Sequence, residues 1–304
     1  VVDYFNWKED YILEIGLTPN RADAASHRGT ARDLKAYFKK ELKPFDYSPL
    51  DIIKPIKSNL SIHVAIENKE ACKRYTGILL TNVTVKASPA WLKQRLESIG
   101  VKSINNIVDI TNYILHDIGQ PLHAFDADKI AGGKITVKAL PANTLFTTLD
   151  GVERKLNAFD CMICDEEKPL CMAGILGGLS SGVSNQTKNI FIESAYFSPA
   201  SIRKTAQAHG LKTDASFRYE RGTYPRITLD ALKKAILLIK ELAGGDIASE
   251  MIDIYPNPIQ DTEITITYTY IWNLIGHHIE KKQIHDILQH LDIKILSHSE
   301  NEFM

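Results

Sequence analysis

The sequence is poor in cysteine and carries almost no net charge. Its 304 residues include only four cysteines, and the formal charge at pH 7 is -1. So few cysteines exclude a disulfide framework and agree with a reducing compartment. The near-neutral balance means that bulk electrostatics do not indicate a nucleic-acid partner, which would need a local basic patch.

Long apolar runs and targeting signals are also lacking. No stretch reaches transmembrane length, and residues 1–10 do not have the basic-then-apolar layout of a signal peptide. We therefore expect a cytoplasmic protein with no membrane partner. With 44% hydrophobic and 24% charged residues, the composition is that of a globular protein, and the length predicts two or three structural units.

The common catalytic signatures are absent too. The sequence has no Ser-His-Asp signature, nucleophile elbow, phosphate-binding loop or dinucleotide fingerprint, which favours a site that positions a substrate and a water molecule. Cys161 and Cys164, with Cys171 nearby, suggest zinc, but no fourth ligand follows at metal spacing. Residues 160–165 predict a strand, where positions three apart face opposite sides. We expect small apolar core thiols instead of a metal site.

Periodicity and turn residues predict interleaved strands and helices. The expected strands lie at residues 61–85, 134–139, 161–165 and 189–194, with a hairpin around 149–151. Helices are expected from the turn at 18–23 to Phe38, from Pro89 (with Ser88 as N-cap) to Gly100, over 105–118, over 199–210 and over 227–242. A proline-containing linker at 255–260 precedes a small unit at 264–304, with a short strand, a turn at Gly276 and a helix through 284–291.

Three features in the middle of the chain leave alternatives open. The glycines at 174–178 either let a ligand approach backbone N–H groups or form a tight loop. His123 lies among apolar neighbours, where a structural role is the more frequent one. Glu193 follows the apolar run at 190–192, so its carboxylate must be solvated, paired or used.

Residues 198–221 carry a local excess of positive charge. Five cations stand against Asp214 and Glu220, and they are Arg203, Lys204, Lys212, Arg218 and Arg221. These cations either form a solvated helix face or contact a phosphate backbone.

Six segments of this sequence together resemble the beta chain of bacterial phenylalanyl-tRNA synthetase. They are residues 18–23 with 29–36, then 105–113, 119–126, 192–197 and 211–222. The blocks are long and ungapped, and the resemblance runs over essentially the whole chain. Such blocks are more specific than any short motif.

The resemblance implies a mixed α/β (α+β) fold in three parts. Residues 1–45 would be the closing half of the first beta-chain module, whose OB-fold insertion is absent here. Residues 46–257 would be a tRNA-binding editing domain of interleaved strands and helices. Residues 258–304 would begin a small, incomplete module with a DNA-binding-like fold. The synthetase-like core and the anticodon-binding domain of the family are missing, so we expect a fragment.

The resemblance also implies an activity. The family charges tRNA(Phe) with phenylalanine, using ATP and magnesium, as an assembly of two alpha and two beta chains. The activating site lies on the alpha chain, so this fragment would have no cofactor and no metal of its own. The beta chain hydrolyses tyrosine wrongly attached to the tRNA, because a phenyl pocket rejects an added hydroxyl by only roughly a hundredfold.

The resemblance also implies site residues, which are assigned by matching positions of this sequence to the family. Glu193 would accept the tyrosyl hydroxyl beside Gly177, and His123 would orient the ester or the attacking water. Thr213 and Ala215 would form the pocket wall and contact the substrate. No nucleophile is implied, so we expect hydrolysis assisted by the substrate's own ribose hydroxyl.

The tRNA contacts are a second set of expectations. Arg203, Lys204, Lys212 and Arg218 would bind tRNA, and Lys102 would bind the substrate end. The family often has arginine where this sequence has Lys102. The planar guanidinium group with its several donors is therefore absent, and we expect a weaker or single-donor contact. The alternative hypothesis is a non-catalytic module for tRNA docking and subunit assembly.

Overall fold

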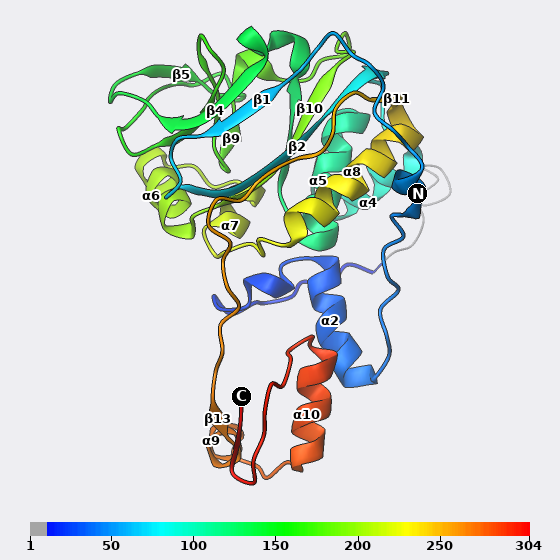
Figure 1. Cartoon of the computed structure of the whole chain (residues 1–304), viewed down its shortest axis with the longest axis vertical. Helices are drawn as coiled ribbons and strands as arrows, with labels where there is room; N and C mark the ends of the chain where they lie inside the picture. Colours follow the sequence, from blue (N-terminus) through cyan, green and yellow to red (C-terminus); the bar gives the residue numbers. More distant parts are fainter. Residues whose placement is uncertain (1–10) are drawn as a thin grey trace, which may run out of the picture.

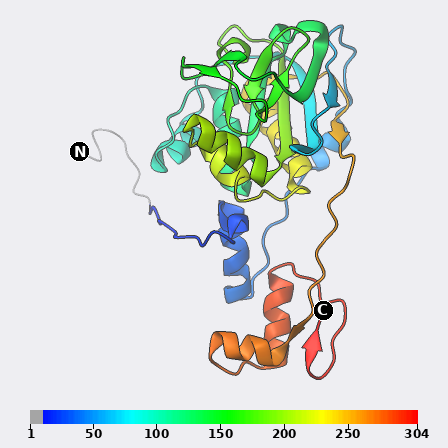
Figure 2. The same cartoon turned by 90° about the vertical axis from the view of Figure 1, so that its left-hand side faces the viewer.

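The computed structural model describes residues 11–304, arranged as three parts. A large body, which we define as residues 62–254, holds both main sheets. Below it lie an N-terminal unit (residues 11–45) and a C-terminal module (residues 264–304), joined to the body by extended chain (Figures 1 and 2). The expectation about a signal peptide concerns residues 1–10 and lies outside the described residues.

The first sheet of the body is built around one long, buried strand. This is β2 (Cys72–Val83), and the strand order is β11 (Gly244–Ile247), β2, β10 (Ile190–Phe197) and β3 (Leu122–Asp126), with β12 (Ile252–Ile254) also paired to β2. All of these pairings are antiparallel. Both faces of β2 and β10 are covered, so the residues of these two strands are buried almost without interruption.

Helices cover one face of this sheet. They are α4 (Ala90–Ser98), α5 (Asn106–Ile118) and α8 (Ile227–Ala243). Ile190 and Ile192 of β10 pack on the helix side, in one cluster with apolar residues of all three helices. Because side chains alternate along a strand, Phe191, Glu193 and Ala195 face the other way.

The second sheet shares that other face. Its order is β1 (His63–Ile66), β4 (Lys134–Ala139), β7 (Cys161–Cys164), β8 (Pro169–Met172) and β9 (Leu176–Gly177), and only the β1–β4 pairing is parallel. One apolar cluster contains residues of both sheets, and it includes all four cysteines, none more than 4% exposed. The expectation that these thiols are core side chains is confirmed.

Shorter elements complete the body. The hairpin β5 (Leu145–Thr147) and β6 (Glu153–Lys155) projects from its edge, and α6 (Pro199–His209) and α7 (Asp214–Tyr219) follow β10 (Figure 1). Connections within the body contain the 3-10 turns η2 (Ala127–Lys129), η3 (Ala131–Gly133) and η4 (Leu179–Ser181). The short helix α3 (Ser48–Asp51) lies in the chain that leads from the N-terminal unit to the body.

The N-terminal unit and the C-terminal module are small. The first contains η1 (Ala22–Ala24) and α2 (His27–Phe38), and the second contains β13 (Ile266–Thr267), α9 (Tyr268–Ile275), α10 (Lys281–His290) and β14 (Glu302–Phe303). Helix α2 packs against α10 and against α5, so it lies between the body and the module (Figures 1 and 2). The linker predicted at 255–260 is irregular chain.

Three local expectations were wrong. Residues 268–275 form a helix that was not predicted, because β13 is only two residues long and Thr267 caps the helix directly after it. Pro89, and not Ser88, is the N-cap of α4; the Ser88 hydroxyl instead donates to Asp109. Glu193 lies within β10 and not at its end, because the strand continues into the buried residues up to Phe197.

Candidate functional site

Two of the predicted site residues lie directly opposite each other on neighbouring strands. Glu193 of β10 pairs with His123 of β3, although 70 positions separate them in the sequence. Directly opposed residues of an antiparallel pair have Cβ atoms about 5 Å apart and point to the same face. Both therefore face the space between the two sheets.

The Glu193 carboxyl group is deeply buried. Its residue is 4% exposed, and the Tyr75 hydroxyl on β2 donates a hydrogen bond to Oε2 at 3.3 Å. Burial raises the pKa of Glu193 to about 8, and the bond from Tyr75 opposes that rise. The group is therefore mostly protonated at neutral pH, where it still accepts hydrogen bonds through its carbonyl oxygen.

The His123 imidazole is neutral and lacks a partner. Part of the residue reaches the surface, but Nε2 is enclosed and has no hydrogen-bond partner within the described chain. The ring makes an edge-on contact with Phe125, with centroids 4.4 Å apart. Burial lowers the pKa of His123 to about 4, so at neutral pH the ring keeps one nitrogen able to accept a proton.

Gly177 provides the close approach that this histidine needs. A Cβ atom at position 177 would lie 2.7 Å from His123 Cε1 and 2.8 Å from Leu149 Cδ1. Gly174 has a φ of +67°, which disfavours residues with a side chain. Gly177 of β9 and Gly174 in the turn before it therefore both serve the packing of the protein itself.

Thr213 and Ala215 join α7 to that loop. Thr213 is the N-cap of α7: its hydroxyl accepts from the Ser216 N–H and donates to the Ile175 carbonyl, both at 3.0 Å. Ala215 packs against the cluster between the sheets. The structure thus brings these two residues to the loop that holds Gly177, the glycine beside His123.

Lys102 does not join this group. It is exposed in the connection between α4 and α5, at the N-terminal end of α5, whereas His123 follows the C-terminal end of that helix. A helix of 13 residues is about 20 Å long. Any contact from Lys102 is therefore with a part of a ligand well away from His123.

The four cations expected to bind tRNA fall into two kinds. Arg203, Lys204 and Lys212 are exposed on α6 and the connection after it. Arg218 is only 8% exposed; its guanidinium donates to the Asp214 carbonyl and approaches His116 Nδ1. Arg218 thus holds α7 against α5 and does not belong to the exposed patch.

Sequence reasoning missed two polar residues of the site. Tyr75 was placed only as part of an apolar strand, which gave no signal of its contact with Glu193. Gln120 is fully buried beside Pro121; its Nε2 donates to the Ala195 carbonyl at 2.8 Å, and its Oε1 is enclosed without a partner. The sequence signal that could have identified Gln120 was the position of a glutamine between the end of a helix and a buried strand.

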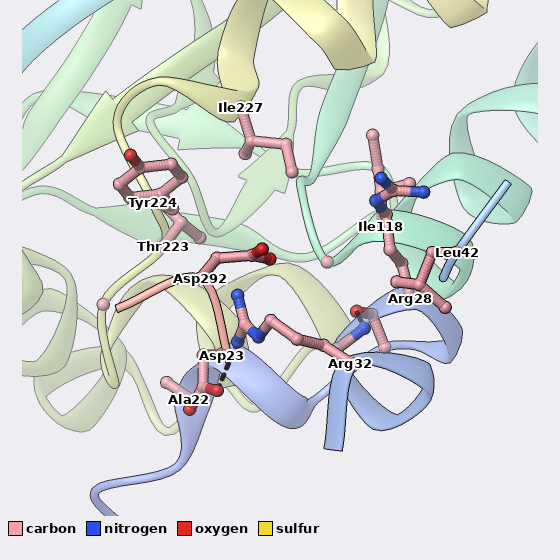
Figure 3. Close-up of a pocket in the computed structure, with 14 residues that line it drawn as sticks. Ala22, Asp23, Arg28, Arg32, Leu42, Ile118, Thr223, Tyr224, Ile227 and Asp292 are labelled. Carbon is pink, nitrogen blue, oxygen red and sulfur yellow. Dashed lines mark hydrogen bonds and ion pairs between the residues drawn. The ribbon is translucent and has the colours of Figure 1, made fainter. Parts of the chain in front are cut away.

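Residues 11–304 contain no group of three or more His, Cys, Asp or Glu arranged to hold a metal ion. A pocket of about 120 Å³ lies where the three parts of the molecule meet (Figure 3). Arg32 and Asp23 form an ion pair there near Asp292, and neither His123 nor Glu193 lines it. A membrane-spanning helix is also not found among these residues.

Comparison with known proteins gives the family. A sequence model of the B3/4 domain matches residues 71–244. The chain is 52% identical over 296 residues to a protein of Bacteroides fragilis (strain YCH46) named phenylalanine–tRNA ligase beta subunit, covering 97% of this chain and 36% of that protein. Proteins of the same name from Porphyromonas gingivalis and Fusobacterium nucleatum are 46% and 43% identical, each covering 96% of this chain and 36% of the relative.

A solved structure also aligns with the chain. It is an N-terminal fragment of the phenylalanyl-tRNA synthetase beta subunit from Pyrococcus horikoshii, with 17% identity, a TM-score of 0.41, and coverage of 94% of this chain and 77% of that one. The chain spans about a third of the length of its curated bacterial relatives. The expected resemblance to beta chains is confirmed, and, because the family model spans more than half of the sequence, the chain belongs to the B3/4 domain family.

Proposed function

We propose that this chain is the editing part of a phenylalanine–tRNA ligase beta subunit, and that it hydrolyses tyrosyl-tRNA(Phe). The observation that carries the proposal is the pairing of His123 with Glu193 between the two sheets. A neutral imidazole with a free nitrogen and a buried carboxyl group that accepts a phenol hydrogen bond are the two groups such a reaction needs. The names of the bacterial relatives support the beta-subunit part of this assignment.

Glu193 would supply the selectivity. Tyr75 already donates its phenol hydroxyl to this carboxyl group, and this contact supports a role for Glu193 in accepting a phenol. A bound phenylalanyl group would leave the buried carboxyl without that additional partner, at a cost of about 1–3 kcal/mol. A site that hydrogen-bonds a substrate hydroxyl in this way discriminates far better than a pocket that only excludes it.

His123 would act on the ester. A water molecule attacks the ester carbonyl carbon, the neutral His123 imidazole orients that water or takes its proton, and the tetrahedral intermediate expels the terminal ribose oxygen. The ribose oxygen takes up a proton, and free tyrosine and uncharged tRNA result. A ribose hydroxyl of the substrate can relay the proton, so no protein nucleophile is required. Gly177, Thr213 and Ala215 would form the wall around the reacting group.

The remaining assignments follow from the resemblance to beta chains and concern the complete enzyme. They are charging of tRNA(Phe) with ATP and magnesium, assembly with an alpha chain as two alpha and two beta subunits, and a cytoplasmic location. Residues 1–45, 46–257 and 258–304 would be the end of the first module, the editing domain and the start of a DNA-binding-like module. This chain has no aminoacylation role of its own in the proposal.

A non-catalytic role in tRNA docking is the second candidate. It is favoured by the exposed cations Arg203 and Lys204 of α6 and Lys212 in the connection after it. These residues fit both functions, because editing also needs a grip on the tRNA backbone. The two functions differ only in whether the ester is cleaved.

Deacylation of tyrosyl-tRNA distinguishes the two candidates. We expect the 304-residue chain, at high enzyme and substrate concentration, to release tyrosine faster than the uncatalysed reaction. His123→Ala and Glu193→Ala should each slow release at least about a hundredfold, in line with loss of a general base or a buried binding group. Equal background rates for all three, with tRNA still bound, would leave the docking role.

A further inference from the structure

Glu193 offers its two carboxyl oxygens to different surroundings. Oε2 accepts the hydrogen bond from Tyr75, which is itself completely buried. Oε1 accepts no hydrogen bond within the described chain. It is also not one of the fully enclosed polar atoms that lack a partner, so it is not fully enclosed. The small exposed part of Glu193 therefore includes Oε1, the oxygen that a ligand can reach.

Tyr75 is placed to fix this division. Its ring lies in the apolar cluster between the sheets, on β2, the strand that pairs with β10 on the side away from β3. Tyr75 aligns with Ala195, two residues along β10 from Glu193, so the phenol approaches the carboxyl diagonally across the two strands. A ring fully enclosed in a packed core has little freedom, and its hydroxyl holds the carboxyl in one rotamer.

We propose that Tyr75 is a positioning residue for tyrosyl recognition: by occupying Oε2 of Glu193 it turns Oε1 toward the substrate, so that the ionised carboxylate accepts two phenols. This inference rests on the proposed editing function. It assigns Tyr75 no contact with the substrate. It also explains why a carboxyl group, and not an amide, suits the position: each of its oxygens accepts a phenol hydrogen bond when the group is ionised.

The other ionisable groups around Glu193 stay neutral near pH 8, so its own titration can be observed. Those that face it are Cys72 and Tyr75 from β2, His123 from β3, Cys161 from β7, Cys171 from β8 and Tyr219 from α7. Burial raises the pKa of each thiol and phenol and lowers that of His123. Ionised Glu193 accepts phenols more strongly than the acid does, so tyrosyl preference should rise with pH through about 8.

The test compares Tyr75→Phe with the wild-type chain. The readout is the ratio of kcat/KM for tyrosyl-tRNA to that for phenylalanyl-tRNA, measured from pH 6.5 to 9. We expect the variant to lower this ratio about tenfold at pH 7.5, with the phenylalanyl rate unchanged. The midpoint of its rise should move to higher pH, because Tyr75 lowers the pKa of Glu193. Tyr268→Phe removes a buried phenol oxygen in the C-terminal module and should change neither quantity.

A second substitution preserves the ring and the donor. Replacing Tyr75 with 3-fluorotyrosine makes the phenol a stronger donor, and we expect the midpoint to move to lower pH. Two results would overturn the inference, provided that Glu193→Ala still loses tyrosyl preference. One is a folded Tyr75→Phe variant that keeps both the wild-type kcat/KM ratio and the wild-type midpoint. The other is a fluorotyrosine chain whose midpoint does not move. If wild type and Glu193→Ala hydrolyse alike at background rates, the proposed function itself fails.

Discussion

At the scale of single residues, the buried carboxyl of Glu193 makes the stability of the fold depend on pH. The pKa of this group rises from 4.5 to about 8 on folding, because burial penalises the charge. Between these two pH values the folded state holds a proton that the unfolded state has released. The free energy of unfolding therefore decreases as pH rises from 4.5 to 8, by at most about 5 kcal/mol from this group.

The variant Glu193→Gln should remove that dependence. We expect the free energy of unfolding of the variant, minus that of the wild type, to increase from pH 5 to pH 8.5. Urea unfolding of both proteins would measure this difference. The difference between the two proteins is the quantity to follow, because His123, with its pKa lowered to about 4, destabilises the fold as pH falls below 6.5. A difference that stays constant over this range would mean that Glu193 is not buried as described.

Gly177 permits a sharper separation of stability from function. Alanine at this position would push its Cβ against His123 and Leu149, and both contacts are with the ends of side chains that can move. We expect Gly177→Ala to cost only about 1 kcal/mol of stability but to reduce tyrosyl-tRNA hydrolysis at least about tenfold, because the imidazole is displaced. The free energy of unfolding and the rate of deacylation, both measured on one preparation of the variant, test this expectation. Undiminished hydrolysis would show that the ring position is not critical.

At the scale of secondary-structure elements, the position of α7 depends on its first residue. Thr213 caps this six-residue helix and binds the loop that holds Gly177, whereas Thr267 caps α9 in the C-terminal module. Thr213→Ala and Thr267→Ala should each cost about 1 kcal/mol. Only Thr213→Ala should slow hydrolysis, because only α7 lies against the site. Equal hydrolysis by both variants would make Thr213 purely a helix cap.

The sequence predicted most elements because their signals are local. Asn105 caps α5 and Gly119 ends it in a left-handed conformation, as their residue types indicate. Gly210 ends α6 in the same way. Alternating apolar residues located β1 and β4, but they could not show that β10 continues past Glu193, since the residues beyond it are buried by contacts with distant strands. Arg218 likewise looked like a surface cation, and only the packing of α7 on α5 shows its burial.

The pairing of site residues was beyond local signals. His123 and Glu193 were each ambiguous in the sequence, and only the resemblance to beta chains suggested that they act together. Their adjacency results from the register of β3 on β10, which a single sequence does not specify. Tyr75 was missed because a tyrosine in an apolar strand looks like any core residue.

At the scale of the whole molecule, the exposed cations on α6 and the connection after it predict salt-dependent binding of tRNA. Replacing Arg203, Lys204 and Lys212 with alanine should weaken binding, and the slope of log affinity against log salt should decrease by about 0.7 to 0.9 for each phosphate that is no longer neutralised. Filter binding at several salt concentrations would measure it. Lys93→Ala removes an exposed lysine that pairs with Glu97 on α4 and should leave the slope unchanged. Helix α4 lies on another side of the body from α6 (Figure 1).

The arrangement of the three parts places the site away from their junction. The N-terminal unit and the C-terminal module meet the body around α2, and the pocket formed there is lined by Arg28, Asp292 and their neighbours (Figure 3). The His123–Glu193 pair lies between the two sheets of the body, within residues 71–244 that match the B3/4 domain. The chemistry we propose therefore belongs to the body alone.

The most direct test of this account is the selectivity of hydrolysis and its dependence on one carboxyl group. Initial rates of deacylation of tyrosyl-tRNA(Phe) and phenylalanyl-tRNA(Phe) should be compared for the 304-residue chain and its Glu193→Ala variant. We predict that the wild-type chain prefers the tyrosyl ester by at least about a hundredfold and that the variant loses this preference. A wild-type chain that hydrolyses both esters equally, or a variant that keeps the full preference, would contradict the account.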